Sequence, residues 1–249
     1  EQELKEINET KNKLFSVIAH DLRGPIAAFE GLLKLFRERE IGEKEFLGFV
    51  PKLSIDIENI SFALNNLLSW GQSQMNGAVT KPDVTPLYNL VIENVNLLSE
   101  IAKQKSIKII NLVEENAYAW SDRDQINIVI RNLISNALKF TPERGMVTIR
   151  SIERNDLWEI SIRDTGVGMN RETVDKLFQN GGTYTSYGTN NEKGTGIGLS
   201  ICKEMVEKNN GTIWVDSIPK KGSCFYFTVP KTDKDTYQNL NTPIGAATA

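Results

Sequence analysis

Apolar side chains recur every three or four residues along the first seventy positions of the chain, and this spacing limits the possible folds more than any other feature. The first run comprises Leu4, Ile7, Leu14, Ile18, Leu22, Phe29, Leu32 and Phe36, and the second Phe46, Phe49, Leu53, Ile57, Ile60, Leu64 and Leu67. Such spacing is typical of amphipathic helices. Because Gly42 interrupts the pattern, the sequence predicts an antiparallel helical hairpin.

Two helices have too little opposing surface to cover both apolar stripes. Two hairpins packed side by side would close one core as a four-helix bundle. We therefore predict a homodimer through residues 1–75, within a hairpin domain of residues 1–76. The alternative is that the hairpin packs against a second domain of the same chain.

Composition narrows the class of protein further. The 249 residues suffice for one or two domains, and 29 Lys plus Arg against 32 Asp plus Glu argue against nucleic acid as the main partner. Cys202 and Cys224 lack metal-ligand spacing, which predicts two buried reduced thiols. The sequence shows neither a run of about 18 apolar residues nor a signal peptide, which predicts a cytoplasmic fragment. Because the chain begins inside a helical repeat, we expect a sensor or membrane segment upstream.

A second domain follows a stretch rich in Gly, Thr, Lys and Pro. The composition predicts a linker over residues 77–86, a domain over 87–231 and a disordered tail over 232–249. Helices are expected over residues 87–105, 123–139 and 198–208, and strands over 107–113, 118–120, 146–153, 157–163, 212–217 and 224–229. Because strands and helices do not alternate regularly, we predict an α+β sandwich with one mixed sheet.

Two segments of this domain are suited to a nucleotide. Asn132 and Asn136 lie four residues apart on one expected helix, with Lys139 about a turn further, so that one face can meet phosphates and Mg²⁺. An equally good interpretation of the segment is that its two asparagines are merely solvated. The segment Asp164-Thr-Gly-Val-Gly follows a strand, where Gly166 and Gly168 allow a tight turn. A carboxylate there could accept a hydrogen bond from the exocyclic amine of adenine.

A third segment has glycines at 194, 196 and 198 and opens a helix. Glycines at a helix N-terminus leave backbone N–H groups accessible to phosphate. Residues 179–193, just before it, contain three glycines and no apolar periodicity. We interpret this loop as a lid over a ligand, with an ordinary surface loop as the alternative.

The only histidine, His20, lies in the first amphipathic run. At 100° per residue it lies about 200° around the helix from Ile18 and Leu22, so it should face outward. At neutral pH imidazole keeps an unprotonated nitrogen that can attack a phosphoryl group. Asp21 could fix its tautomer and act as base, and Gly24-Pro25 predicts a hinge. The alternative is an idle surface histidine.

Taken together, these segments resemble the motifs of sensor histidine kinases. FSVIAHDLRGP resembles the H box, NLISNALKFT the N box, Asp164 to Met169 the G1 box, Leu177-Phe178 part of the F box and Gly194 to Ile201 the G2 box. The match covers nearly all of residues 8–230. It implies a GHKL-type (Bergerat) ATP-binding domain behind a dimeric four-helix bundle, with Mg²⁺ at Asn136, adenine at Asp164 and an ATP lid over residues 179–196. The nucleotide-binding residues that it implies are Asn132, Asn136, Lys139, Phe140, Asp164, Gly166, Gly168, Gly194, Thr195, Gly196, Gly198 and Leu199.

The resemblance also implies an activity. His20, assisted by Asp21, would accept the γ-phosphoryl group of Mg-ATP and pass it to an aspartate of a response-regulator receiver domain. Gly24 stands where many relatives have Thr or Asn, to which the resemblance assigns the positioning of water for phosphatase activity, so that activity is not implied. Two other classes stay open: an ATP-driven conformational machine of the gyrase or chaperone kind, and a degenerate kinase that serves as a binding module.

Overall fold

The computed structural model describes residues 24, 26–51, 53, 57, 80–178, 188–190 and 198–233. Contacts within the chain divide it into two compact units, Glu1–Val79 and Thr80–Ala249. The described residues do not include five of the predicted site residues, nor most of the predicted tail. The five are His20, Asp21, Gly194, Thr195 and Gly196. Along the part of the chain that the structure describes, no helix has the length and apolar character needed to cross a membrane.

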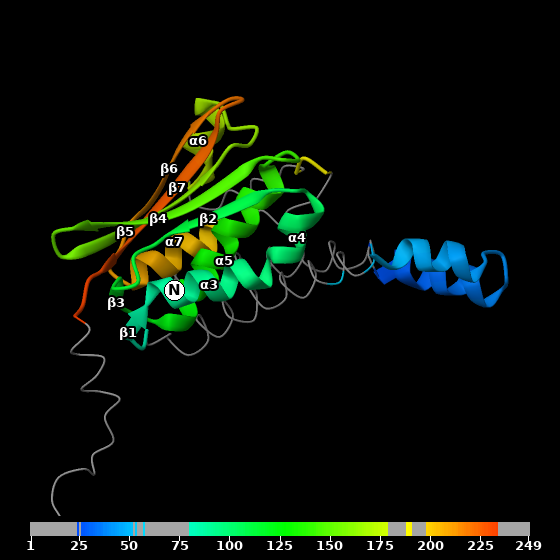
Figure 1. Ribbon diagram of the computed structural model, residues 1–249, viewed down its shortest axis with the longest axis horizontal. Coiled ribbons are helices and arrows are strands. Elements are labelled where there is room, and N and C mark those ends of the chain that lie inside the picture. The colour runs from blue at the N-terminus through cyan, green and yellow to red at the C-terminus, as the bar shows by residue number, and fades with distance from the viewer. Residues whose placement is uncertain are drawn as a thin grey trace, which may run out of the picture. The chain divides into compact units, whose positions relative to one another are not determined.

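The described part of the first unit is a helical hairpin, with helices over residues 26–37 and 43–51 (Figure 1). The first helix ends in a Schellman motif. The backbone N–H of Glu40 donates to the carbonyl of Leu35 at 2.9 Å, and that of Arg39 to the carbonyl of Phe36 at 3.1 Å. Arg39 takes the left-handed conformation that this motif needs, with φ 61°.

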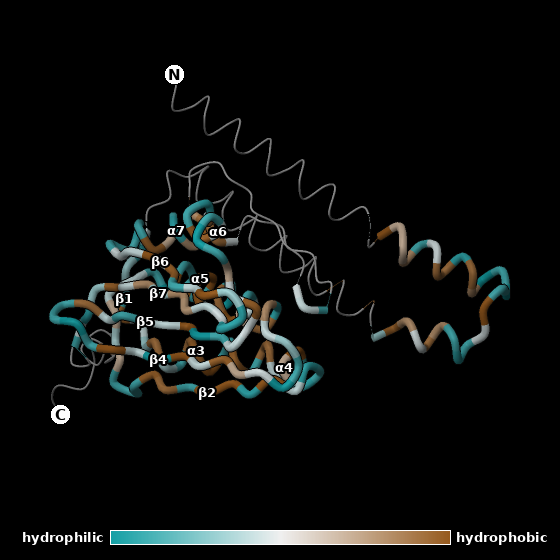
Figure 2. Tube along the Cα trace, turned by 90° about the horizontal axis from the view of Figure 1, so that it is seen from above, coloured by the Kyte–Doolittle hydropathy of each residue, from teal (hydrophilic) through white to brown (hydrophobic). Residues whose placement is uncertain are grey.

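The second helix of the hairpin begins at the predicted break. The backbone N–H of Gly42 donates to the carboxylate of Glu45 at 3.2 Å, as in the side-chain half of a capping box. The rings of Phe36 and Phe46, one from each helix, lie 4.6 Å apart. Apolar and polar stretches alternate along both helices (Figure 2). A turn at Gly42 between two amphipathic helices is therefore confirmed for these residues.

The second unit is an α/β sandwich. In chain order its elements are β1 (Asp83–Pro86), α3 (Leu87–Leu97), α4 (Ser99–Gln104), β2 (Lys108–Leu112), β3 (Tyr118–Ser121), α5 (Arg123–Phe140), β4 (Met146–Arg154), β5 (Leu157–Asp164), α6 (Arg171–Leu177), α7 (Gly198–Lys208), β6 (Ile213–Ile218) and β7 (Gly222–Pro230). Five strands form a sheet of order β2-β4-β5-β7-β6, in which only β2 and β4 pair in parallel. Helices α3, α5 and α7 lie along one face of it (Figure 1). The mixed sheet is confirmed.

Helix α5 lies at the centre of the unit and packs against both α3 and α7. The carboxylate of Asp122 caps its start by accepting from the backbone N–H groups of Asp124 and Gln125, both at 3.1 Å. One face of α5 is fully buried and includes Ile126, Val129, Ile130, Leu133, Ile134 and Leu138. The helix ends at Phe140 because Thr141, which precedes Pro142, is extended. Cys202 and Cys224 are buried free thiols, as predicted.

The linker predicted over residues 77–86 is wrong for its last four residues. Asp83–Pro86 form β1, which pairs antiparallel with β3 in a separate two-stranded sheet. A strand at a sheet edge tolerates prolines, because the missing N–H group is not needed there. The second domain also starts before Leu87 and extends past Lys231, since the N–H of Thr232 donates to the carbonyl of Tyr118. Helix α6 was not predicted, and the helix expected over 87–105 is divided at Leu98.

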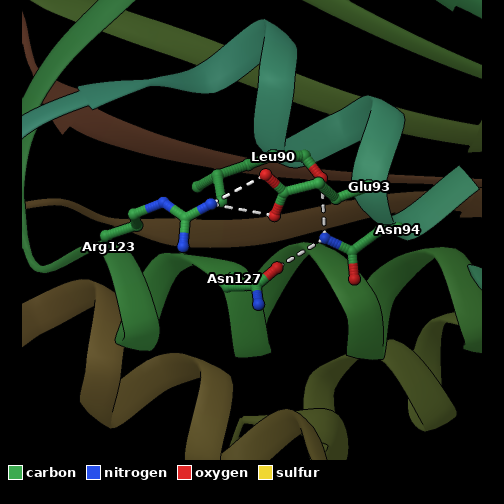
Figure 3. A network of polar contacts seen from close by, with 5 residues as sticks. All are labelled: Leu90, Glu93, Asn94, Arg123 and Asn127. Atoms are coloured by element: carbon green, nitrogen blue, oxygen red, sulfur yellow. Dashed lines mark hydrogen bonds and ion pairs between the residues drawn. The ribbon is translucent and has the colours of Figure 1, made fainter.

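A polar network joins α3 to α5 (Figure 3). The amide nitrogen of Asn94, a buried residue, donates to the carbonyl of Leu90 at 2.7 Å and to Oδ1 of Asn127 at 2.6 Å. Beside it, the exposed guanidinium of Arg123 donates to both carboxylate oxygens of Glu93, at 2.7 and 2.9 Å. A buried amide that bridges two helices should contribute more to stability than an exposed ion pair.

We expect Asn94→Ala to lower the free energy of unfolding of the second unit by about 2 kcal/mol, because it leaves a cavity and an amide oxygen without its donor. The matched control is Glu93→Gln, next to it in the same network, which should change this free energy by less than about 0.5 kcal/mol. Urea denaturation measures both. Equal effects would contradict the assignment of the stabilising contact to Asn94.

Candidate nucleotide-binding site

Helix α5 carries the first group of candidate residues, and they differ in burial. Asn132 is only 4% exposed, and its amide nitrogen donates to the carbonyl of Ile128 at 3.0 Å. Asn136, Lys139 and Phe140 are half-buried toward the C-terminal end of the helix. The ammonium of Lys139 lies 4.8 Å from the centroid of the Phe140 ring. The later residues of this group are therefore more accessible than Asn132.

The candidate carboxylate ends β5, as the sequence predicts. Asp164 is 3% exposed, and its Oδ1 accepts from the backbone N–H groups of Gly166 at 2.8 Å and Ser223 at 3.1 Å. Burial raises the pKa of Asp164 above its ordinary value, and the two backbone hydrogen bonds partly offset that rise. The carboxyl group is thus held in a fixed orientation in a poorly solvated place, which suits the recognition of a hydrogen-bond donor.

The two glycines after Asp164 cannot be replaced without steric conflict. A Cβ on Gly166 would lie 2.4 Å from the carbonyl oxygen of Phe140. Gly168 has φ +63°, and a Cβ there would lie 2.0 Å from the carbonyl oxygen of Ile218. The segment therefore needs glycine for close backbone approach at one position, and at the other for both approach and conformation.

The separate motifs meet around α5. The N–H of Val167 donates to the carbonyl of Phe140 at 3.2 Å, which joins the loop after Asp164 to the end of the helix. A Cβ on Gly198 would lie 2.8 Å from Oδ1 of Asn132, so the first residue of α7 borders the middle of α5. Gly198 and the neighbouring Leu199 are half-buried. The structure thus brings the loop after Asp164 and the first residue of α7, Gly198, to one helix.

Sequence reasoning missed the support that β6 and β7 give to this loop. Besides the bond from Ser223 to Asp164, the N–H of Lys220 donates to the carbonyl of Val167 at 2.6 Å, and Oγ of Ser217 accepts from the N–H of Met169 at 2.8 Å. The sequence predicts strands over residues 212–217 and 224–229 but does not indicate that they support this loop. The available signal was a pair of serines, Ser217 and Ser223, on the strand ends that flank the turn of residues 219–221.

Comparisons with known proteins agree with this arrangement. Residues 121–233 match the family described as histidine kinase-, DNA gyrase B- and HSP90-like ATPase. The chain is 31% identical over 228 residues to the adaptive-response sensory kinase SasA of Prochlorococcus marinus, covering 91% of this chain and 58% of that protein. The chain therefore spans little more than half of that relative's length.

Solved histidine kinases share the fold. The catalytic domain of the histidine kinase ThkA superposes with a TM-score of 0.54 at 28% identity, covering 61% of this chain and 97% of that domain. ThkA in complex with the response regulator protein TrrA matches with a TM-score of 0.70 at 21% identity, covering 92% of this chain and 64% of that one, which is a likeness in fold.

The family match, the mixed sheet and the described contacts around α5 define residues 121–233 as an ATPase domain of the GHKL type. The likeness to sensor histidine kinases extends beyond this domain, because the match to SasA covers 91% of this chain.

Proposed function

We propose that this chain is the kinase core of a two-component system. It transfers the γ-phosphoryl group of Mg-ATP to His20 and then to an aspartate of a response-regulator receiver domain. The observation that carries the proposal is the convergence on α5, where Asn132 borders Gly198 and Phe140 contacts the loop that begins at Asp164. ThkA, which shares the fold, was solved with a response regulator, which supports the choice of partner.

The nucleotide roles follow from the chemistry of each side chain. Both described hydrogen bonds of Asp164 end on Oδ1, and Oδ2 is the oxygen that we assign to the exocyclic amine of adenine. Lys139 and Asn132 serve the phosphates, and the backbone at Gly194 to Leu199 cradles them. The half-buried amide oxygen of Asn136 fits Mg²⁺, which takes few protein oxygens beside those of phosphates. The metal would neutralise charge on the transferred group.

The transfer itself needs a nucleophile and an acceptor for one proton. The unprotonated ring nitrogen of His20 forms the new N–P bond as the bond from the γ-phosphorus to the bridging oxygen breaks and ADP leaves. Asp21 accepts a hydrogen bond from the N–H group of the other ring nitrogen, which fixes the tautomer, and it takes up this proton as positive charge develops on the ring. The protein's contribution is mainly orientation and charge neutralisation.

The proposed homodimer through residues 1–75 explains why the hairpin leaves apolar side chains uncovered. Leu33, Leu47 and Phe49 are 42%, 57% and 48% exposed, respectively, in the single chain. Their burial in a four-helix bundle would remove this surface from water. Sedimentation equilibrium should therefore give twice the chain mass of 28.0 kDa. A monomer at micromolar concentration would refute the dimer.

The proposed activity is tested by incubating the chain with Mg²⁺ and ATP labelled at the γ-phosphate. We expect label on the protein that is lost in acid and kept in base, as a phosphoramidate requires, and that moves to a receiver domain. Sustained release of phosphate without a labelled protein would instead favour an ATP-driven conformational machine. Failure to bind ATP by calorimetry would favour a binding module.

A further inference from the structure

A buried lysine links two segments that lie far apart in the sequence. Lys105 directly follows α4 and is 4% exposed. Its ammonium donates to the carbonyl of Leu138 at 2.8 Å, to the carbonyl of Lys139 at 3.1 Å and to Oγ1 of Thr189 at 2.7 Å. Burial of an ammonium is costly unless its donors are satisfied. The carbonyls at the C-terminal end of α5 carry the negative end of the helix dipole, which favours a cation there.

Thr189 is held to the same helix end by its own groups. Its backbone N–H donates to the carbonyl of Lys139 at 3.0 Å. Its hydroxyl lies 3.1 Å from the carbonyl oxygen of Lys139 and 3.0 Å from that of Thr141. Because a hydroxyl has one proton, it can donate to one of these carbonyls while it accepts from Lys105. Side chain and backbone together fix residues 188–190 on the last turn of α5.

This last turn is also where the candidate nucleotide site is assembled. Phe140 provides the carbonyl that binds Val167 and closely approaches Gly166, and Asn136 lies one helical turn earlier. Thr189 falls within the range that the sequence predicts as the ATP lid. A displacement of residues 188–190, or of the Lys139 carbonyl, would therefore act on the region that is proposed to hold the phosphates.

We propose that Lys105 and Thr189 are positioning residues for nucleotide binding, acting through the C-terminal turn of α5. This inference rests on the proposed function. Lys105 keeps the terminal carbonyls of α5 and the hydroxyl of Thr189 in one hydrogen-bonded cluster, so that Lys139 and Phe140 keep their places beside the loop that follows Asp164.

The test uses the full chain and a non-hydrolysable ATP analogue in calorimetry. Thr189→Val removes the hydroxyl and keeps shape and backbone N–H, and we expect the analogue to bind about three- to tenfold more weakly, which is about the net contribution of one ordinary hydrogen bond. The conservative Thr189→Ser should restore affinity to within about twofold. Lys105→Met should weaken binding at least as much as Thr189→Val, and the double variant should bind no more weakly than Lys105→Met alone.

Two readouts separate positioning from support of the fold. Lys103→Met, at an exposed lysine two residues away, is the matched control and should change neither affinity nor Tm. A Thr189→Val variant that binds the analogue as tightly as the wild type would overturn the proposal, as would a Lys105→Met variant with a lower Tm and unchanged affinity.

Hydrogen exchange distinguishes failure of this inference from failure of the proposed function. In the nucleotide-free protein, exchange at the amide of Thr189 should be slow in the wild type and faster in Lys105→Met. Unchanged exchange in that variant would overturn the proposal that Lys105 holds Thr189 in place, whatever the result for nucleotide binding. A wild-type chain that shows slow exchange at this amide but binds no nucleotide would refute the proposed function, and with it the role of Lys105 in nucleotide binding.

Discussion

The His20→Gln variant is expected to take up no label from γ-labelled ATP while it binds the nucleotide within about twofold of the wild type. Glutamine resembles histidine in polarity, but its amide nitrogen cannot attack phosphorus, so the loss should be complete. Nucleotide affinity should be kept because the candidate ATP site is built from residues of the second compact unit alone. Filter binding of the label and calorimetry with the ATP analogue measure the two quantities.

A mixed dimer gives the sharpest control for this prediction. His20→Gln keeps the ATP site and lacks the acceptor, whereas a chain that cannot bind ATP keeps the acceptor. If transfer runs across the dimer, co-refolding the two should restore label on the chain that has His20. If transfer runs within one chain, neither partner should be labelled. Label that persists on His20→Gln alone would show that another residue is the acceptor, and the proposed chemistry would be wrong.

The elements that were predicted correctly are those whose signals are local. Helix α5 has an acidic cap at Asp122, an apolar face with the helical period and a proline just after its end, and each signal acts within a few residues. Strands β4 and β5 alternate apolar and polar residues on either side of Asn155-Asp156, and Asn155 has φ 50° in the turn between them. Signals from residues close together in the sequence were sufficient to predict these elements.

The contacts that were not predicted join residues far apart in the sequence. Strand β1 was assigned to a linker because of Pro82 and Pro86, yet Val84 is buried and Oγ1 of Thr85 donates to the carbonyl of Ser121. Lys105 and Thr189 show no pattern that would connect them. The periodicity of a sequence does not predict which turn will lie beside which helix end, because that contact depends on how the whole domain packs.

In the candidate site, too, features set by neighbouring residues were predicted, and features set by contacts between distant residues were not. The sequence placed Asn132 and Asn136 on one helix face, but it could not show that Asn132 is almost completely buried against Gly198. Likewise, Asp164 was chosen because it ends a strand before glycines, whereas its support by Ser223 depends on the pairing of β5 with β7. Motifs thus identify which residues carry the chemistry, and the fold determines their solvation and orientation.

Asp164→Asn is expected to weaken binding of the ATP analogue by roughly a hundredfold without lowering the stability of the domain. The asparagine oxygen can still accept from the N–H groups of Gly166 and Ser223, so the loop should keep its conformation. The new amide nitrogen is a donor, and it would face the amine of adenine, which is also a donor. A lost charged hydrogen bond and an unpaired donor together account for a factor of this size.

The difference in stability between this variant and the wild type depends on pH with a defined sign. Burial raises the pKa of Asp164 above 3.8, so the charged form is less favourable in the folded domain than in the unfolded chain. In the wild type, Asp164 makes its full contribution to the free energy of unfolding below pH 3.8. This contribution is lost as the pH rises through the raised pKa. The amide side chain of the variant does not titrate. The Tm of the variant, relative to that of the wild type, should therefore increase as the pH rises. At about pH 7 it should equal or exceed the Tm of the wild type.

Two comparisons decide whether Asp164 recognises the base or only supports the loop. Asp216→Asn changes an exposed carboxylate on strand β6, which is separated from β5 by β7, and it should leave nucleotide affinity unchanged. Guanine presents an acceptor oxygen where adenine presents its amine, so Asp164→Asn should bind a GTP analogue no more weakly than the wild type does, while it loses the ATP analogue. Equal weakening of both nucleotides, with a lower Tm at neutral pH, would mean that the carboxylate holds the loop and does not contact the base.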